Sequence, residues 1–165
     1  MKKLIFVRHA KAEPEEEIPG LSDFERSLTP GGKKVSKYMA QQFLKKDTSP
    51  GLMITSPAFR ALETAFIFAE ETGVSYDDVR LESRLYFNTN LEKLLEILSE
   101  ISEDVNTVSL FGHNPSFTDM PDKLSAEGCE SVPKAGVVCI TFNTDKWSEI
   151  KKRSGKIEYF LKPPR

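Results

Sequence analysis

Three short apolar runs, each stopped abruptly by a polar motif, constrain the fold of this chain more than any other feature. The runs are Lys3–Val7, Leu52–Thr55 and Thr107–Phe111. Runs of four or five residues are too short for buried helices and are typical of strands buried on both faces of a parallel sheet. Because parallel strands end at one carboxyl edge, the polar motifs that follow the runs should meet at that edge.

The stretches between these runs carry amphipathic helix patterns that open with capping residues. A side chain that can cap the first turn, followed by proline, favours a helix start. The predicted helices begin at Thr29-Pro30, Ser56-Pro57, Leu91 and Asn114, the second of them running to about Glu71.

Further β-rich segments are predicted over Val79–Glu82, Gly136–Phe142 and Ile157–Leu161. Strands that alternate with helices indicate an α/β fold, here a three-layer α/β/α sandwich around a mostly parallel central sheet. A chain of 165 residues is long enough for one well-filled core. We therefore predict one domain over residues 1–165.

The charge and the cysteine content narrow the class of protein. The net charge of −2 gives no general attraction to nucleic acid or to an anionic membrane. No apolar run approaches the ~20 residues of a membrane span, and the N-terminal one is too short for a signal peptide. Cys129 and Cys139 are too few for a disulfide framework, and with two histidines they make a poor zinc set. We expect a cytoplasmic monomer with reduced thiols and no metal or cofactor.

Four side chains with affinity for anions fall at the predicted strand ends. Arg8 and His9 follow the first strand, His113 follows the strand Thr107–Phe111, and Arg60 lies in the first turn of the helix after Leu52–Thr55. Taken singly, each is compatible with an ordinary surface residue. Together they predict a positive cluster at one sheet edge, where a helix N-terminus with an added arginine suits a dianion.

The motifs that carry these residues resemble those of the histidine phosphatase superfamily, which has the phosphoglycerate-mutase-like fold. "VRHAKAE" resembles the family's Arg-His-Gly signature, with Ala10 in place of the usual glycine. "SPAFRALETA" is similar to its second arginine motif, and "GHNPSF" to its second histidine motif. The short chain and the segment "RSLTPGGK" resemble the SixA-type phosphohistidine phosphatases, in which a further arginine, here Arg26, joins the phosphate pocket.

The resemblance implies a mechanism in which His9 attacks phosphorus and is transiently phosphorylated. Arg8, Arg26 and Arg60 would hold the phosphoryl oxygens and disfavour protonation of His9, which must be neutral to attack. His113, expected to be protonated, would span the equatorial oxygens. Water would then hydrolyse the phosphoenzyme, and no metal is required.

The general acid and the substrate remain open at this point. Mutase-like relatives protonate the leaving group with a glutamate, and Glu82 lies near that position but out of register. An ion pair of Glu82 with Arg80 or Arg84 is favoured over that role. The sequence therefore favours phosphohistidine carried on a protein, with a small-molecule phosphomonoesterase using Glu82 as the alternative and a phosphate-binding module without turnover as a third hypothesis.

Overall fold

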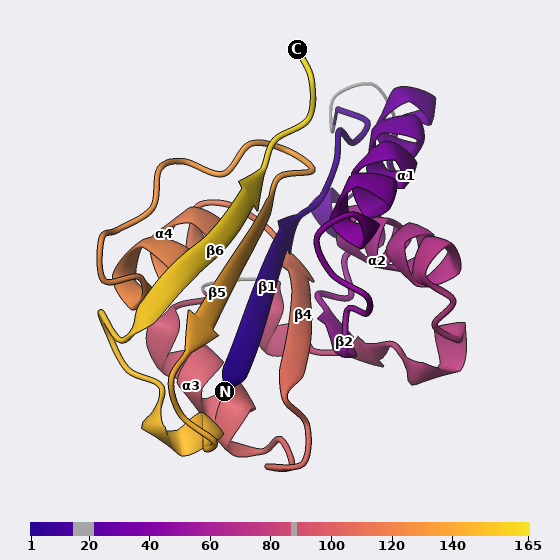
Figure 1. Ribbon diagram of the computed structural model, residues 1–165. Coiled ribbons are helices and arrows are strands. Elements are labelled where there is room, and N and C mark those ends of the chain that lie inside the picture. Colours follow the sequence, from indigo (N-terminus) through magenta and orange to yellow (C-terminus); the bar gives the residue numbers. More distant parts are fainter. Residues whose placement is uncertain (15–21, 87–88) are drawn as a thin grey trace.

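A computed structural model, which describes residues 1–14, 22–86 and 89–165, contains one six-stranded sheet with the strand order β3-β2-β4-β1-β5-β6 (Figure 1). β1 to β4 pair in parallel, and β5 and β6 add to the β1 side as antiparallel strands. The strands are β1 (Lys2–Arg8), β2 (Leu52–Thr55), β3 (Arg80–Leu81), β4 (Thr107–Gly112), β5 (Val137–Phe142) and β6 (Gly155–Leu161). The predicted α/β sandwich with a mostly parallel sheet is confirmed.

In the described part of the chain, four α-helices cover the two faces of this sheet. They are α1 (Pro30–Leu44), α2 (Phe59–Thr72), α3 (Leu91–Ser99) and α4 (Ser116–Leu124). α1 and α2 pack on one face with Ile5 and Val7 of β1, whereas α3 and α4 pack on the other with Leu4 and Phe6. Successive side chains of β1 therefore pack into the cores on opposite faces of the sheet, which explains why the middle of the strand is apolar on both faces.

Two predicted helix starts are wrong in detail. α2 begins at Phe59 and not at Ser56-Pro57, so the Ser56 hydroxyl lies ahead of the helix and contacts His113. α4 begins at Ser116, and Asn114 does not cap it. The Asn114 side chain instead donates to the Val132 carbonyl and accepts from the Thr118 hydroxyl. These hydrogen bonds connect the segment after β4 to the segment before β5.

The remaining elements are short 3-10 turns: η2 (Asp23–Glu25), η3 (Tyr76–Asp78), η4 (Ser83–Leu85) and η5 (Trp147–Glu149). The predicted strand 79–82 is reduced to the two residues of β3, because η4 begins directly after Glu82. η2 and η4 flank the carboxyl edge of the sheet and contribute residues to the site below. The acidic segment 11–24 falls partly outside the described residues.

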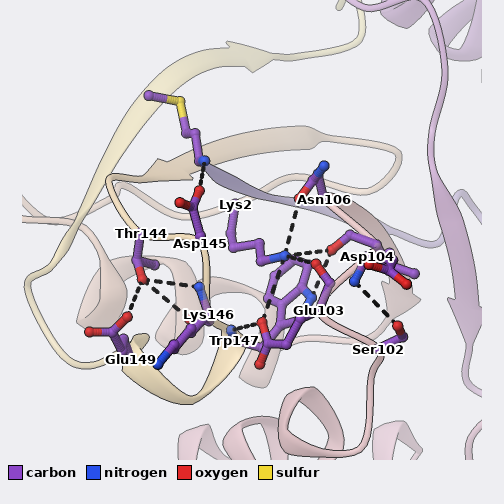
Figure 2. A network of polar contacts seen from close by, with 12 residues as sticks. Lys2, Ser102, Glu103, Asp104, Asn106, Thr144, Asp145, Lys146, Trp147 and Glu149 are labelled. Atoms are coloured by element: carbon purple, nitrogen blue, oxygen red, sulfur yellow. Dashed lines mark hydrogen bonds and ion pairs between the residues drawn. The ribbon is translucent and has the colours of Figure 1, made fainter.

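At the opposite edge of the sheet, Lys2 is fully buried at the start of β1. Its ammonium group donates to the carbonyls of Glu103 and Val105 and to Asn106 Oδ1, at 2.6, 2.9 and 3.1 Å (Figure 2). It also lies 5.1 Å from the centre of the Trp147 ring. All three ammonium protons therefore have acceptors, as a buried charge requires.

Candidate active site

The carboxyl ends of β1 and β4 bring both histidines of the chain together. Arg8 pairs with Gly112 in register, and the backbone N–H of His9 donates to the Gly112 carbonyl at 3.0 Å. The residues that follow are therefore neighbours, and the ring centres of His9 and His113 lie 5.1 Å apart. Each histidine is only 7% exposed, so the pair sits in a recess at the sheet edge.

The hydrogen bond made by His9 fixes which of its ring nitrogens is available for attack. Nδ1 lies 2.7 Å from the carbonyl oxygen of Ala10, which can only accept, so Nδ1 carries the proton. Nε2 then carries the lone pair. Burial, together with the charges of Arg60, Arg8 and Lys134, lowers the pKa of His9 to about 4. At neutral pH the ring is therefore neutral.

His113 is held by the Ser56 hydroxyl, which lies 2.8 Å from Nε2, while Nδ1 is buried without a partner. Burial, the neighbouring His9 and Arg60 lower the pKa of His113 to about 3. In the protein by itself His113 is therefore neutral, and its expected protonation in contact with a phosphoryl group stays a prediction. An anion in contact with Nδ1 would favour a proton there and raise this pKa, because a nearby negative charge stabilises the charged form of the ring.

Two arginines complete the recess, and each leaves one buried N–H group without a partner. Arg8 uses Nη1 to donate to the Val132 carbonyl at 3.0 Å, but its Nε is unpartnered. Arg60, 5% exposed, is likewise unpartnered at Nε. In the described part of the chain, these two atoms and Nδ1 of His113 are the buried side-chain nitrogens and oxygens that lack a hydrogen bond. Buried donors are nearly always paired, so a group of them at one site indicates a missing acceptor.

One carboxylate, that of Asp23 in η2, organises the arginines, and the sequence analysis did not single it out. Arg60 donates to the Asp23 carbonyl at 2.6 Å and to Oδ2 at 3.0 Å, while Arg26 donates to Oδ1 at 2.8 Å. The Tyr86 hydroxyl lies 2.9 Å from Oδ2. Although burial alone would raise it, the pKa of Asp23 is lowered to about 2 by the hydrogen bonds from Arg26, Tyr86 and Arg60.

Arg26 is linked to the recess by its hydrogen bonds to the Asp23 carboxylate. Its remaining hydrogen bond goes to the Glu13 carbonyl at 3.1 Å. Arg26 thus shares Asp23 with Arg60 and does not line the cavity described below, whereas Arg8, His9, Arg60 and His113 lie together at the sheet edge.

Glu82 does not join this group. It accepts from Arg84 at Nε and Nη2, at 2.9 and 2.7 Å, and also from the Arg84 backbone N–H. These hydrogen bonds lower the pKa of Glu82, so it is ionised at neutral pH. Of the two roles that the sequence left open, the structure shows the ion pair with Arg84.

A cavity of about 370 Å³ lies beside the histidine pair and is lined by His113. Its walls come from η2, α2, the segment after η4 and the first turn of α4. The lining residues are Asp23, Arg60, Tyr86, Thr89, His113, Asn114, Pro115, Ser116 and Asp119. Both His113 and Arg60 are shared with the recess, so a group bound at the two unpartnered donors would extend into this cavity.

Over residues 1–14, 22–86 and 89–165, no cluster of three or more histidine, cysteine or acidic side chains is arranged to hold a metal ion. Over the same residues, no helix has the length and apolar character needed to cross a membrane.

Comparison with known proteins gives a family and a fold. Residues 4–86 match the histidine phosphatase superfamily, branch 1. A comparison with curated proteins by sequence gave no match. The solved structure of a protein histidine phosphatase SixA in complex with tungstate is similar over 98% of this chain and 97% of its own, with a TM-score of 0.79 and 20% identity.

Two further solved structures illustrate the range of this fold. A candidate phosphohistidine phosphatase SixA from Agrobacterium tumefaciens has 24% identity and a TM-score of 0.75, with 98% of each chain covered. A mycobacterial glucosyl-3-phosphoglycerate phosphatase has 14% identity and a TM-score of 0.70, covering 96% of this chain and 98% of its own. A protein histidine phosphatase and a glucosyl-3-phosphoglycerate phosphatase thus share the fold, so the fold alone does not select the substrate.

Proposed function

Because this chain belongs to the histidine phosphatase superfamily, we propose that it hydrolyses phosphohistidine on a protein through a phosphorylated His9, without a metal ion. The observation that carries the proposal is a group of three unpartnered buried nitrogens, two of them arginine N–H groups, next to a histidine whose Nε2 carries the lone pair. A phosphoryl group supplies the missing acceptors and the electrophile together.

In the first half of the reaction, His9 Nε2 attacks phosphorus in line and the leaving group departs on the opposite side. Arg8 and Arg60 donate to the phosphoryl oxygens through the atoms that lack partners in the protein. His113 donates from Nδ1 as negative charge moves towards those oxygens. Because these donors are already buried and fixed, little reorganisation is needed as the charge develops.

In the second half, water attacks the phosphorylated His9 and releases inorganic phosphate. The Nδ1–H of His9 stays on the Ala10 carbonyl throughout, so the ring departs from phosphorus as a neutral imidazole. No carboxylic acid has to protonate this leaving group.

The same reasoning supports phosphohistidine over alkyl phosphates as the substrate. An alkoxide leaving group needs a proton from an acid, and Glu82 is ionised and bound to Arg84. An imidazole leaving group whose second nitrogen is already protonated needs no such acid. We extend the proposal to a cytoplasmic location, consistent with the two free cysteines.

The test is to present the protein with a phosphohistidine-bearing phosphotransfer domain and, in parallel, with a panel of sugar phosphates. We expect turnover of the phosphohistidine protein, with acid-labile phosphate trapped on His9 and detected by mass spectrometry of the native protein. His9→Ala should abolish both signals. Faster turnover of sugar phosphates, with a large loss in Glu82→Gln, would instead identify a small-molecule phosphomonoesterase.

A further inference from the structure

The cavity next to the histidine pair has a polar outer wall that the phosphoryl chemistry does not use. Asp119, in the first turn of α4, lines this cavity together with His113 and Arg60. Its side chain is exposed, and within residues 1–14, 22–86 and 89–165 its carboxylate takes part in no hydrogen bond or ion pair. By contrast, both carboxylate oxygens of Asp23, the other acidic residue of the cavity, accept from Arg26, Arg60 or Tyr86.

An aromatic wall borders the same cavity. The Tyr86 ring packs edge-on against His113, with ring centres 5.7 Å apart, and Phe24 packs against Tyr86 at 5.2 Å. Phe59, 41% exposed, continues this row at 5.9 Å from Phe24. Of these rings Tyr86 lines the cavity, and an aromatic ring there suits a planar leaving group.

From this arrangement we infer that the cavity is a leaving-group subsite for an N–H-bearing heterocycle, with Tyr86 as its wall and Asp119 as the acceptor of the ring's second N–H. The inference rests on the proposed function and names the part of the substrate that it recognises. The occupant is the imidazole ring of a phosphorylated histidine. A leaving group with a second negative charge would be repelled by Asp119.

The chemistry gives Asp119 a definite task. A phosphorylated imidazole with a proton on its other nitrogen is cationic, and it leaves as neutral imidazole when the P–N bond breaks and the electron pair returns to the ring nitrogen. A new P–N bond forms at the same time to Nε2 of His9, and no proton is transferred. A carboxylate hydrogen-bonded to the second N–H stabilises the cationic ring and so keeps the leaving group in its reactive form.

The two imidazoles in the reaction would then be held in matching ways. The Nδ1–H of His9 is accepted by the Ala10 carbonyl at 2.7 Å, and the second N–H of the substrate ring is accepted by Asp119. Each ring keeps its proton while the phosphoryl group passes between the nitrogens that face each other. The charged acceptor on the substrate side keeps that ring protonated, which is the form that departs as neutral imidazole.

The experiment compares Asp119→Ala and Asp119→Asn with the wild-type protein on two small probes, N-phosphoimidazole and p-nitrophenyl phosphate. The second probe has no ring nitrogen. We expect kcat/KM for phosphoimidazole to fall about 10- to 100-fold in Asp119→Ala, the usual effect of losing a hydrogen bond to a charged group, and less in Asp119→Asn. The value for p-nitrophenyl phosphate should change less than about threefold.

The pH profile of kcat distinguishes a hydrogen bond from Asp119 to the substrate ring from a purely structural role of Asp119. Loss of the carboxylate should move the alkaline limb of kcat on phosphoimidazole to lower pH, because the bound ring then loses its proton more easily. Glu92→Gln is the matched control, since Glu92 is an exposed acidic residue in the first turn of α3 and lies outside the cavity. It should leave both probes and the profile unchanged.

Two results would overturn the inference while leaving the proposed function in place: equal losses on both probes in Asp119→Ala, or no loss on phosphoimidazole and no shift of the alkaline limb. A wild-type protein that turns over p-nitrophenyl phosphate but neither phosphoimidazole nor a phosphohistidine protein would overturn the proposed function, and the subsite with it.

Discussion

Positively charged side chains are buried at both ends of strand β1, but only at one end do all their buried donors have hydrogen-bond acceptors. At the start of the strand, Lys2 is completely enclosed and every ammonium proton has an acceptor. At the other end, Arg8 and Arg60 each keep a buried Nε without a partner, and His113 does the same with Nδ1. We call the Lys2 end of the strand the finished end, because its charged group has all its hydrogen bonds. The Arg8 end is the unfinished end, because buried nitrogens there lack partners.

This difference separates a structural role from a binding role. A buried charge with all its hydrogen bonds made contributes to the free energy of folding and has little left to offer a ligand. Buried donors without acceptors cost stability in the protein alone, and that cost is recovered when a ligand supplies the acceptors. For a buried cationic side chain, the presence or absence of unpartnered donors therefore distinguishes a binding role from a structural one better than the charge does.

Replacing Arg60 at the unfinished end should give the largest effect, a loss of catalytic efficiency. Arg60→Met should lower kcat/KM on a phosphohistidine substrate by about 10³-fold, as expected when a preorganised donor to the transferred group is removed. Its free energy of unfolding should change by no more than about 1 kcal/mol, because the lost hydrogen bonds to Asp23 are offset by removal of a buried unpartnered Nε. Steady-state kinetics and urea unfolding measure the two quantities. A variant that unfolds readily yet retains its kinetic constants would reverse the assignment of the two ends.

Inorganic phosphate should stabilise the protein through the unfinished end. At a phosphate concentration of 100 times Kd, the free energy of unfolding should rise by about 2.7 kcal/mol. This gain should vanish in Arg60→Met and persist in Lys2→Met, which retains the recess. Thermal unfolding at increasing phosphate concentration tests it, with sodium chloride at equal ionic strength as the control. Equal stabilisation of wild type and Arg60→Met would place the phosphate elsewhere.

Replacing Lys2 should affect stability alone. Lys2→Met keeps the length of the side chain but removes donors to the Glu103 carbonyl and Asn106, whereas the Val105 carbonyl still accepts from Trp147 at 2.9 Å. We expect a loss of about 2 kcal/mol in the free energy of unfolding, with kcat/KM unchanged within about twofold. Exposed Lys146→Met is the control and should cost less than about 0.5 kcal/mol. An unchanged unfolding midpoint in Lys2→Met would show that the network of Figure 2 adds nothing to stability.

Much of the fold could be predicted from the sequence because local pattern and tertiary structure agree. The strand Leu52–Thr55 was predicted with its observed bounds, and Lys3–Val7 lacked one residue at each end. The start of α2 was misplaced because Ser56 and Pro57 look like a cap and a first turn, while the structure uses the Ser56 hydroxyl to hold His113. A local signal was overridden there by a contact between residues 57 positions apart.

The site was predictable where its residues adjoin strands and not where it depends on loops. Arg8, His9 and His113 follow directly from strands whose ends share an edge. Asp23 has no such signal, since only the folded chain shows it bridging Arg26 and Arg60. The neutral state of His113 in the protein by itself could not be read from a count of charges, because such a count does not include the cost of burying the ring.

The pH dependence of stability between pH 7 and pH 5 should come from the two histidines of the unfinished end. The folded-state pKa values of His9 and His113 are lowered to about 4 and about 3, against about 6.5 in the unfolded chain. The unfolded chain therefore takes up protons first as pH falls, so the stability present above about pH 6.5 is progressively lost, by roughly 2 kcal/mol per ring between pH 7 and pH 5. Asp23, with its pKa at about 2, contributes nothing over this range.

Urea unfolding at intervals from pH 7 to pH 5 checks this slope in three proteins. His113→Gln should lose about half of it, since the chain has only two histidines, while Lys2→Met should start from lower stability and keep the wild-type slope. Saturating phosphate should flatten the wild-type curve, because a bound dianion raises the pKa of both rings towards the unfolded value. A wild-type curve that is already flat without phosphate would mean that the rings are not held neutral by burial, and the free lone pair assigned to His9 Nε2 would lose its physical basis.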